Sequence, residues 1–489
     1  MKRKIAIASL LLLIIVGCIP KRYEWSPNGL WITVLSQDGL RIADAKGNLS
    51  PAILPGVTIA TWFPDSSRLL VSVPEDVASW DDLKAVLTSD QITSIADAID
   101  RVHDFASTYD WKTSGDVDWF NFLSRVGNEE KLARGADAAR VFDQWGGAIG
   151  LYVRDHDDPA LKSKMPAKRW QELSQVHQHI ALVESVAFDG QKFDIQQQTA
   201  VPNQQNPTEL RISPTGRQAL VVFAGDNSVC DLWEISLDGQ QSPIKLSDSA
   251  AWYPDFSPDG RDVYFVRAVG AQTNNNDSRL GSLSRLRVLD DKGMMKPHPD
   301  NPDDLVGVLY SGLERVRCLK DGRVIFSSVD VSLPATGGDL PSKPQLYALT
   351  PNQPTVTRLL TRKAFESVGG GAWWFELSPD SSHVAIGSET GTIAVVDLTD
   401  GSVSQAQSQP MPGYTDSTGS TVTVPSWRNN QQLTFAAPGA DNEHWSVQLW
   451  TMTQQPGASN QVAGKSINLS ATWPPELLTD IRPQPATKP

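Results

Sequence analysis

The stretch Phe256 to Gly260 reads F-S-P-D-G, and the apolar residues Val263 and Phe265 alternate with polar neighbours soon after it. Proline presets the backbone at the first central position of a turn, and Asp and Gly favour the positions that follow. Apolar residues at every second position indicate a strand with one face more buried than the other. The stretch therefore predicts a tight turn that leads into a strand.

The same pattern recurs along the chain. Copies begin at Trp25, Trp62, Ile212, Phe256 and Leu377, and degenerate copies begin at Cys318 and Ser426. A second strand follows most copies, so each predicts a small antiparallel meander. Measured at the Pro position, the copies are separated by 37, 150, 44, 62, 59 and 49 residues. Five of these spacings fit propeller blades of about 40 to 50 residues with loops added, and one insertion accounts for the sixth.

We therefore predict a mainly β fold: a seven-bladed β-propeller, with six or eight blades as alternatives, and an α-helical insertion in the second blade. Radial sheets leave only short, protected edges, which suits a long all-β chain. The repeated S-P-D-G turn with its alternating strand resembles the TolB-type and WD-repeat-like β-propellers of bacterial envelopes. That resemblance implies a fold and not a function, because propellers host many activities.

The composition divides the chain into five predicted parts. They are a signal peptide (1–17), the first propeller segment (18–74), a helical insertion (75–178), the remaining propeller (179–475) and a flexible tail (476–489). Apolar residues at helical spacing predict four to six helices in the insertion, the first capped by Ser79 with Asp82 and the last covering 170–183. We expect the insertion to be a recognition element or a lid over the central channel; the alternative is that it only packs on the propeller side.

The first eighteen residues carry a targeting signal. Three basic residues (2–4) precede an apolar run of 12 residues, Ile5 to Val16, which is shorter than the roughly 20 residues of a membrane span. The ending Ile15-Val16-Gly17-Cys18 resembles the bacterial lipobox, which implies lipidation of Cys18 as the mature N-terminus; a plain secretory signal is the alternative. Ile19 favours the outer membrane over the inner one.

Charge excludes one class of partner. The chain has 43 Lys and Arg against 56 Asp and Glu, a formal net charge of -13. Nucleic-acid binding needs clustered basic residues, so we expect no nucleic-acid partner. Hydrophobic residues make up 40% of the chain, an ordinary globular share that excludes a wholly disordered protein.

The remaining candidate sites receive structural interpretations. Cys230 and Cys318 are expected to be buried thiols that do not pair with each other. The pair His177 and His179 is expected on a helix, where residues two apart do not face one another, so no zinc site is predicted. The turn aspartates are expected to be turn formers and not calcium ligands. Residues 408–423 are expected to form a long inter-blade loop, and residues 467–471 to pair with the first repeat and close the ring.

Two classes of function remain open. The first is a non-catalytic envelope lipoprotein whose propeller binds protein or glycan partners through its faces or its helical insert. The alternative is an envelope enzyme, such as a hydrolase, lyase or cyclotransferase, with a site in the propeller channel. That alternative would need two or more convergent carboxylates or histidines at the channel. We predict no catalytic residue, no cofactor and no metal site, and lipidation at Cys18 is the one site assigned.

Overall fold

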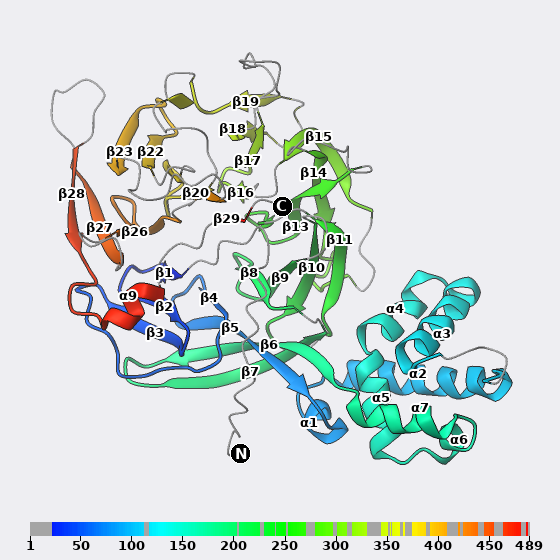
Figure 1. Ribbon diagram of the computed structural model, residues 1–489. Helices are drawn as coiled ribbons and strands as arrows, with labels where there is room; N and C mark the ends of the chain where they lie inside the picture. Colours follow the sequence, from blue (N-terminus) through cyan, green and yellow to red (C-terminus); the bar gives the residue numbers. More distant parts are fainter. Residues whose placement is uncertain are drawn as a thin grey trace.

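The fold was established with a computed structural model of the chain (Figure 1). The structure describes residues 22–480 and 486–487, except for the segments 112–116, 203–204, 225–228, 240, 251–252, 270–278, 297–300, 311–314, 330–343, 351–352, 354, 362–364, 367–373, 388–391, 408–418, 421–423, 439–444 and 454–462. The signal peptide and Cys18 therefore lie outside the described residues.

The described chain is mainly β, as the repeats predicted, and its sheets are antiparallel meanders. The first sheets are formed by β1 (Tyr23–Trp25), β2 (Trp31–Ser36) and β3 (Gly39–Asp44), and by β4 (Ile59–Trp62), β5 (Arg68–Val77), β6 (Gln178–Phe188) and β7 (Phe193–Pro202). An eight-stranded sheet follows, made of β8 (Pro207–Ile212), β9 (Gln218–Ala224), β10 (Cys230–Ser236), β11 (Ile244–Ala250), β12 (Asp255–Phe256), β13 (Asp262–Ala268), β14 (Arg279–Arg287) and β15 (Asp303–Tyr310). Its two halves are linked by a single residue pair, Ala250 with Arg267, between β11 and β13.

The C-terminal half repeats this arrangement in three four-stranded sheets. Their strands are β16 (Val316–Cys318), β17 (Val324–Val329), β18 (Pro344–Leu349) and β19 (Val356–Arg358); β20 (Trp374–Leu377), β21 (His383–Gly387), β22 (Ile393–Asp397) and β23 (Val403–Gln407); and β25 (Ser426–Asn429), β26 (Gln432–Pro438), β27 (Trp445–Thr453) and β28 (Ala463–Asn468). Figure 1 shows the sheets arranged around a common centre. The first strand of each meander is innermost, because neighbouring first strands contact one another: β1 with β4 and β25, β4 with β8, β12 with β16, and β20 with β25.

The repeated turn explains why each first strand ends where it does. In the copy at Phe256, the backbone N–H of Gly260 donates to the Ser257 carbonyl (2.8 Å), and the Asp259 carboxylate accepts from the Ser257 hydroxyl (2.6 Å) and the Arg261 N–H (3.1 Å). The last turn position is left-handed, with φ of 72° at Gly260. Glycine adopts this conformation without steric cost, which accounts for its place in the repeat.

The ring closes by packing and not by the strand pairing that we expected. Residues 463–468 form β28, which pairs with β27 of the last sheet. The first and last sheets are joined instead through Tyr23, whose hydroxyl donates to the Val424 carbonyl (2.9 Å) and accepts from the Ala436 N–H (2.7 Å). The prediction was wrong because this segment forms the edge strand of the last sheet. A strand-like pattern in the sequence does not identify the partner strand.

The predicted flexible tail is also partly wrong. Helix α9 (Pro475–Asp480) buries Leu477 between the first and last sheets, and the indole N–H of Trp473 just before it donates to the Gly47 carbonyl (2.7 Å). Farther on, β29 (Ala486–Thr487) pairs with β24 (Gly419–Ser420), a strand inside the predicted inter-blade loop of 408–423. The other residues of that loop lie outside the described part of the chain.

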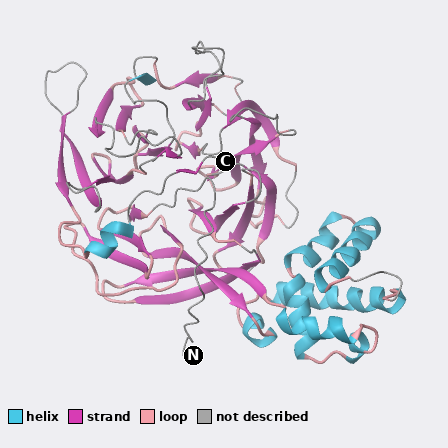
Figure 2. Ribbon diagram, in the orientation of Figure 1, coloured by secondary structure: helices cyan, strands magenta, loops and turns pink. Residues whose placement is uncertain are grey.

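The connection from β5 to β6 contains the described helices that precede residue 178. They are α1 (Trp80–Lys84), α2 (Ser89–Thr108), α3 (Trp119–Arg134), α4 (Ala136–Gln144), α5 (Gly146–Asp155), α6 (Pro159–Lys162), α7 (Ala167–Glu172) and the 3-10 helix η1 (Leu173–Gln175). Their apolar faces form a core of their own, which β6 and β7 border through Ile180 and Ala200. Figure 2 shows these helices gathered beside the sheets.

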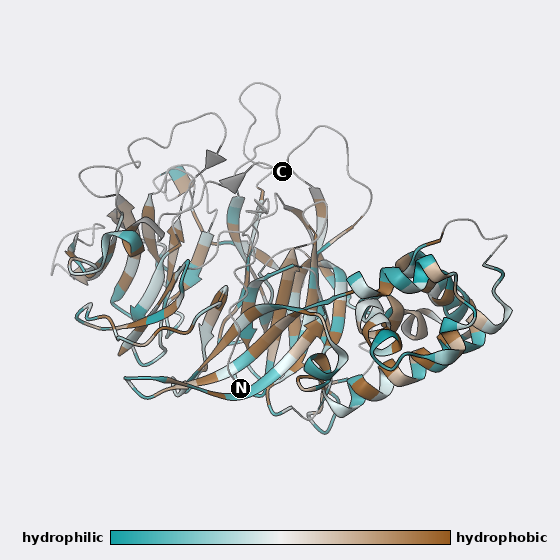
Figure 3. Ribbon diagram, turned by 60° about the horizontal axis from the view of Figure 1, so that its bottom comes forward, coloured by the Kyte–Doolittle hydropathy of each residue, from teal (hydrophilic) through white to brown (hydrophobic). Residues whose placement is uncertain are grey.

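Two expectations for this segment need correction. Figures 1 and 3 both place the helices at the outer side of the ring, so they are not a lid over its centre. The predicted helix over 170–183 is wrong, because α7 ends at Glu172 and β6 begins at Gln178. Residues 178–188 hydrogen-bond to both β5 and β7, and this long-range pairing of a Val- and Ile-rich segment overrides its local helical spacing.

Candidate functional site: a charged cavity between the inner strands

A small cavity lies where the inner strands of five meanders converge. It is lined by Glu24, Ile59, Ala60, Thr61, Thr208, Glu209, Leu210, Arg211, Tyr253, Arg315, Arg317 and Trp374, and its volume is about 30 Å³. A buried water needs at least about 10–15 Å³ of such volume, so the cavity has room for a few small atoms and not for a whole substrate. The lining combines charged and aromatic side chains on rigid strands.

Arg211 and Asp255 form the first ion pair of the site. The guanidinium of Arg211 donates to both carboxylate oxygens of Asp255, at 2.7 and 3.2 Å. The same carboxylate accepts backbone N–H groups from Phe256 (3.0 Å) and Cys318 (2.9 Å), so it ties β8, β12 and β16 together. Burial opposes the charge of Arg211, but the contacts with Asp255 outweigh burial and raise the pKa of Arg211. The Asp255 carboxylate thus accepts four hydrogen bonds, which gives this pair a structural role.

Four further charges form a looser cluster beside that pair. Arg315 and Arg317 flank Val316 at the start of β16 and expose only 2% and 1% of their surface. Arg315 lies 3.2 Å from a Glu376 oxygen and 3.8 Å from a Glu209 oxygen, and Arg317 lies 3.5 and 3.4 Å from the same two carboxylates. These distances exceed the 2.7–2.9 Å typical of strong charge-assisted hydrogen bonds. The two arginines are thus neutralised but incompletely hydrogen-bonded.

Aromatic rings hold Arg315 in place. Its guanidinium carbon lies 3.5 Å from the Trp374 ring centroid and 4.6 Å from the Tyr253 ring centroid. The two rings contact each other edge to face, with centroids 4.8 Å apart. An arginine between two aromatic faces is fixed in direction as well as attracted by the ring quadrupoles. The cationic group therefore cannot swing away to find other acceptors.

Within the described residues of the cavity, unpartnered buried donors outnumber unpartnered buried acceptors. Among the described residues, no hydrogen-bond partner is found for Nε and Nη1 of Arg315, Nε of Arg317, Nε1 of Trp374 or Oε2 of Glu209, all of them buried. Burial raises the pKa of Glu209 to about 7 against the opposing effect of Arg317. Buried polar groups without partners are rare in folded proteins and call for a function or a bound species.

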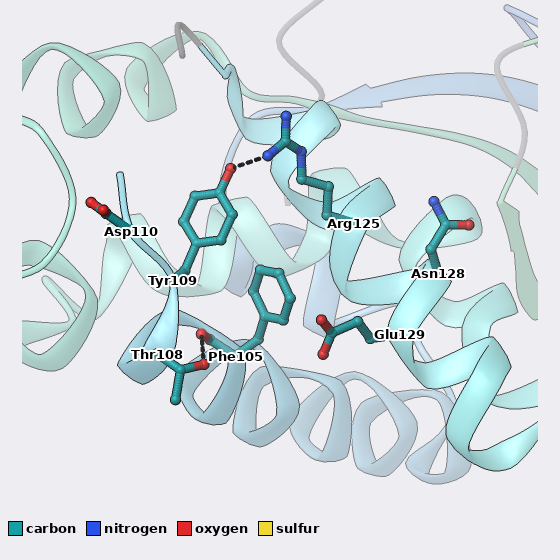
Figure 4. Close-up of a pocket in the computed structure, with 7 residues that line it drawn as sticks. All are labelled: Phe105, Thr108, Tyr109, Asp110, Arg125, Asn128 and Glu129. Atoms are coloured by element: carbon teal, nitrogen blue, oxygen red, sulfur yellow. Dashed lines mark hydrogen bonds between the residues drawn. The ribbon is translucent and has the colours of Figure 1, made fainter. Parts of the chain in front are cut away.

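The helical segment carries a second, more open hollow, shown in Figure 4. It has a volume of about 390 Å³ and is lined by Phe105, Thr108, Tyr109, Asp110, Arg125, Asn128 and Glu129, from the end of α2 and from α3. Arg125 Nη1 donates to the Tyr109 hydroxyl at 2.8 Å, and the Phe105 and Tyr109 rings are 5.2 Å apart. An aromatic floor with a mixed-charge rim is a feature of protein-binding surfaces.

The structure places the sequence-predicted candidates as follows. Cys230 is buried, but Cys318 is partly exposed, so its predicted burial is wrong; no disulfide joins the two. His177 precedes β6 and His179 lies within it, not on a helix, and both Nδ1 atoms contact the Asp76 carboxylate, at 2.9 and 3.3 Å. Within the described residues, no group of three or more potential ligands has a metal-binding arrangement. Cys18 lies in the part of the chain that the structure does not describe.

The turn aspartates behave as predicted. Asp65, Asp259, Asp321 and Asp380 each accept the backbone N–H of the residue two positions on, at 3.0 to 3.1 Å. These bonds are those of Asx turns, which lower the pKa of each carboxyl and stabilise the turn. The four residues therefore have a structural role.

The residues of the charged cavity were missed by the sequence analysis, although the repeat contains their signal. The third and fifth residues before the Pro position are Arg211 and Glu209 in one copy, Asp255 and Tyr253 in the next, then Arg317 and Arg315, and finally Glu376 and Trp374. Two residues apart on a strand means the same face. The columns of the repeat that face the centre therefore contain charged and aromatic residues.

Within the described residues, no helix is both long and apolar enough to span a membrane. No protein-family model matches the sequence, and no curated protein matches it either.

Solved structures to which the chain is similar include TolB from Acinetobacter baumannii, with 16% identity and a TM-score of 0.34 over 65% of this chain and 67% of that one. Another is the β-propeller domain of Cps50 (Swd1) from Myceliophteria thermophila, with 8% identity and a TM-score of 0.43 over 89% and 97% of the two chains. A third is an oligogalacturonate lyase in complex with manganese, with 11% identity and a TM-score of 0.38 over 78% and 76%. The expected similarity to TolB-type and WD-repeat-like propellers is therefore found among solved structures.

Proposed function

We propose that this protein is a non-catalytic binding scaffold of the bacterial cell envelope, built as a seven-bladed β-propeller with a helical insertion in its second blade. The blade number counts the eight-stranded sheet as two blades, since a single residue pair links its halves. The repeat spacing supports the same count. The proposed ligands are proteins or glycans bound through the propeller faces or the insertion.

The proposed location follows from the leader. Three basic residues, a short apolar run and Gly17-Cys18 are the elements of a lipoprotein signal, and Ile19 favours the outer membrane. Several acyl chains on Cys18 would anchor the protein stably, because one chain alone binds only marginally. A Cys18→Ser variant is expected to leave the membrane pellet and to appear in the soluble envelope fraction. Retention of that variant in the pellet would contradict the anchor.

The observation that carries the scaffold proposal is the pairing of the central carboxylates. Asp255 is bidentate to Arg211, and Glu209 and Glu376 each lie within 4 Å of both Arg315 and Arg317. A guanidinium at this distance favours the ionised form of a carboxyl group and so opposes its use as a proton donor. The arrangement suits rigid packing of inner strands better than acid–base catalysis.

One observation favours the alternative, an envelope enzyme with a site in the channel. Glu209, Asp255 and Glu376 converge on one region, and burial raises the pKa of Glu209 to about 7, a value suited to a general acid. If the protein turns over a glycan or peptide, Glu209→Gln should abolish turnover while binding persists. Unchanged turnover in that variant would show that the active site does not lie in the channel.

The insertion is the proposed recognition element, and its position allows a clean deletion. Val77 and Gln178 are paired directly across β5 and β6. Removing residues 78–177 and joining these two through Asn-Gly creates a two-residue hairpin turn of the favoured type. Ile180→Thr should accompany the deletion, because Ile180 borders the core of the insertion.

The deleted protein should keep its β-sheet circular dichroism and lose crosslinks to its envelope partner. A matched test in the full chain is Glu129→Lys, which reverses a charge at the hollow of Figure 4, with Lys131→Glu, away from that hollow, as its control. Loss of crosslinks in the first variant alone would support the hollow as the contact surface. Full crosslinking by the deletion variant would show that the insertion is not the recognition element.

A further inference from the structure

We propose that the cavity between the inner strands binds the carboxylate group of a ligand, held by Arg315 and Arg317. This inference is independent of the scaffold proposal, since it stands whether or not the insertion has a partner. It rests on the donor surplus, the size of the cavity and the charges around it.

The unpartnered donors of the cavity indicate which chemical group the ligand presents. Arg315 Nε and Nη1, Arg317 Nε and Trp374 Nε1 are buried donors without a hydrogen-bond partner among the described residues. Guanidinium groups match carboxylates in shape, because both are planar and present parallel donor and acceptor pairs. A neutral oxygen accepts weaker hydrogen bonds from these N–H groups and leaves the charge unpaired, and a cationic group accepts none.

The size of the cavity limits what enters it. A volume of about 30 Å³ has room for a carboxylate and little more, so the rest of the ligand would lie outside the cavity. Thr61 and Thr208, from β4 and β8, also line this space and offer hydroxyl contacts beyond the arginines, whereas the Glu24 carboxylate on β1 opposes a bound anion. Two sources share the required group: a free small organic acid and the C-terminus of a peptide.

The charges explain how an additional anion is tolerated. With all groups ionised, Arg315 and Arg317 are balanced by Glu209 and Glu376, so a bound anion would add to the negative charge of Glu24, which also lines the cavity. Protonation of Glu209 removes one of these negative charges. Besides these three neighbours, Glu209 faces Arg211 on its own strand and Asp255 on β12, which are paired with each other. The pKa of Glu209, raised to about 7 by burial, places this protonation near neutrality.

The test is titration calorimetry of the full-length protein with acetate, with acetamide as a neutral control of the same shape. Acetate should bind with the uptake of one proton, seen as a dependence of the heat on the ionisation enthalpy of the buffer. Its affinity should fall about tenfold per pH unit above the pKa of Glu209, because one proton is linked to binding.

Tetra-alanine with a free or an amidated C-terminus distinguishes the two sources of the carboxylate. If the free peptide binds much more tightly than acetate and than the amidated peptide, the ligand is a peptide C-terminus. If the free peptide binds no more tightly than acetate, the ligand is a small acid.

Two variants make the proposal falsifiable. Glu209→Gln removes the competing negative charge with little change in shape, so acetate should bind more tightly and without pH dependence. Arg317→Gln should abolish binding, with folding checked by circular dichroism. Absence of binding to both wild type and Glu209→Gln at about 50 mM acetate, well above a millimolar Kd, would overturn the proposal. Equal binding of acetate and acetamide would also overturn it.

Discussion

The guanidinium of Arg315 lies 3.5 Å from the ring centroid of Trp374, and both side chains are almost completely buried. Arg315 stands just before β16 and Trp374 begins β20, so this contact joins two sheets that follow one another in the sequence. A buried arginine is costly unless its charge and donors are matched. The two glutamates balance its charge and the ring covers the guanidinium, while Nε and Nη1 have no hydrogen-bond partner among the described residues.

Replacing Trp374 tests the contribution of this contact. Trp374→Ala should lower the free energy of unfolding by about 3–5 kcal/mol, because it leaves a cavity and uncovers the guanidinium. Trp374→Phe retains an aromatic face and should lower the free energy of unfolding clearly less than Trp374→Ala does. Urea denaturation of the three proteins measures the difference, and equal losses in both variants would argue against a specific role of the aromatic face.

Glu234 should make the protein less stable as the pH rises. It is fully buried on β10, neither carboxyl oxygen has a hydrogen-bond partner among the described residues, and burial raises its pKa to about 8. The folded state therefore holds a proton that the unfolded chain releases near pH 4.3. The stabilisation from this proton is complete below pH 4.3 and is lost as the pH rises to about 8. Glu234→Gln should consequently gain stability over wild type across that range.

Thermal melts between pH 5 and pH 8 measure this gain, which should reach a few kcal/mol at the upper end. The exposed residue Glu129 provides the control, since Glu129→Gln should follow wild type at each pH. A constant difference between Glu234→Gln and wild type would show that Glu234 is ionised in the folded protein.

Replacing Ser381 with glycine should increase the stability of the folded protein. It occupies the left-handed position of its turn with φ of 61°, the position that Gly260 takes with φ of 72°. A residue with a Cβ is strained there by about 1–2 kcal/mol, and the greater flexibility of glycine in the unfolded chain offsets part of this. Ser381→Gly should therefore raise stability by up to about 1 kcal/mol, whereas Gly260→Ser should lower it. Chemical denaturation of both variants checks the opposite signs.

The related Ser66 is a less suitable site for the same change, which makes it an internal comparison. Its φ is also 61°, but its hydroxyl accepts the Asn28 N–H at 3.0 Å. Ser66→Gly should gain less stability than Ser381→Gly, because it loses this hydrogen bond between two sheets. A larger gain at Ser66 would show that the contact contributes nothing.

Closure of the ring should depend on Trp473. Its side chain is buried between the first and last sheets, and its indole N–H donates to Gly47. Trp473→Ala should cost about 3–5 kcal/mol and speed hydrogen exchange chiefly in β2 and β27, the strands that α9 contacts. Uniform acceleration over all sheets would show that the ring opens elsewhere.

The sequence predicted the sheets well because their signal is local and repeated. Turns such as Phe256 to Gly260 fix the backbone through Pro, Asp and Gly, and the alternation after them identifies the strand. Segments 170–183 and 467–471 were assigned wrongly, since their structure depends on partner strands that a local pattern does not reveal. The predicted tail was wrong at α9 for the same reason.

The charged cavity was not predicted because its members come from separate copies of the repeat. Glu209 and Arg317 are 108 residues apart, and each alone resembles an ordinary polar residue of a strand. Only the ring brings them together. The columns three and five residues before the Pro position would have identified them if the copies had been aligned on that position.

Because Val77 pairs directly with Gln178, the second sheet is also a suitable insertion site for foreign domains. The chain leaves and re-enters the sheet about 5 Å apart, the distance between neighbouring strands. Any folded module with similarly close ends, such as a fluorescent reporter or an affinity domain, can replace the helices without shifting the register of β5 and β6. The propeller would then display a chosen cargo at its rim while its charged centre stays intact.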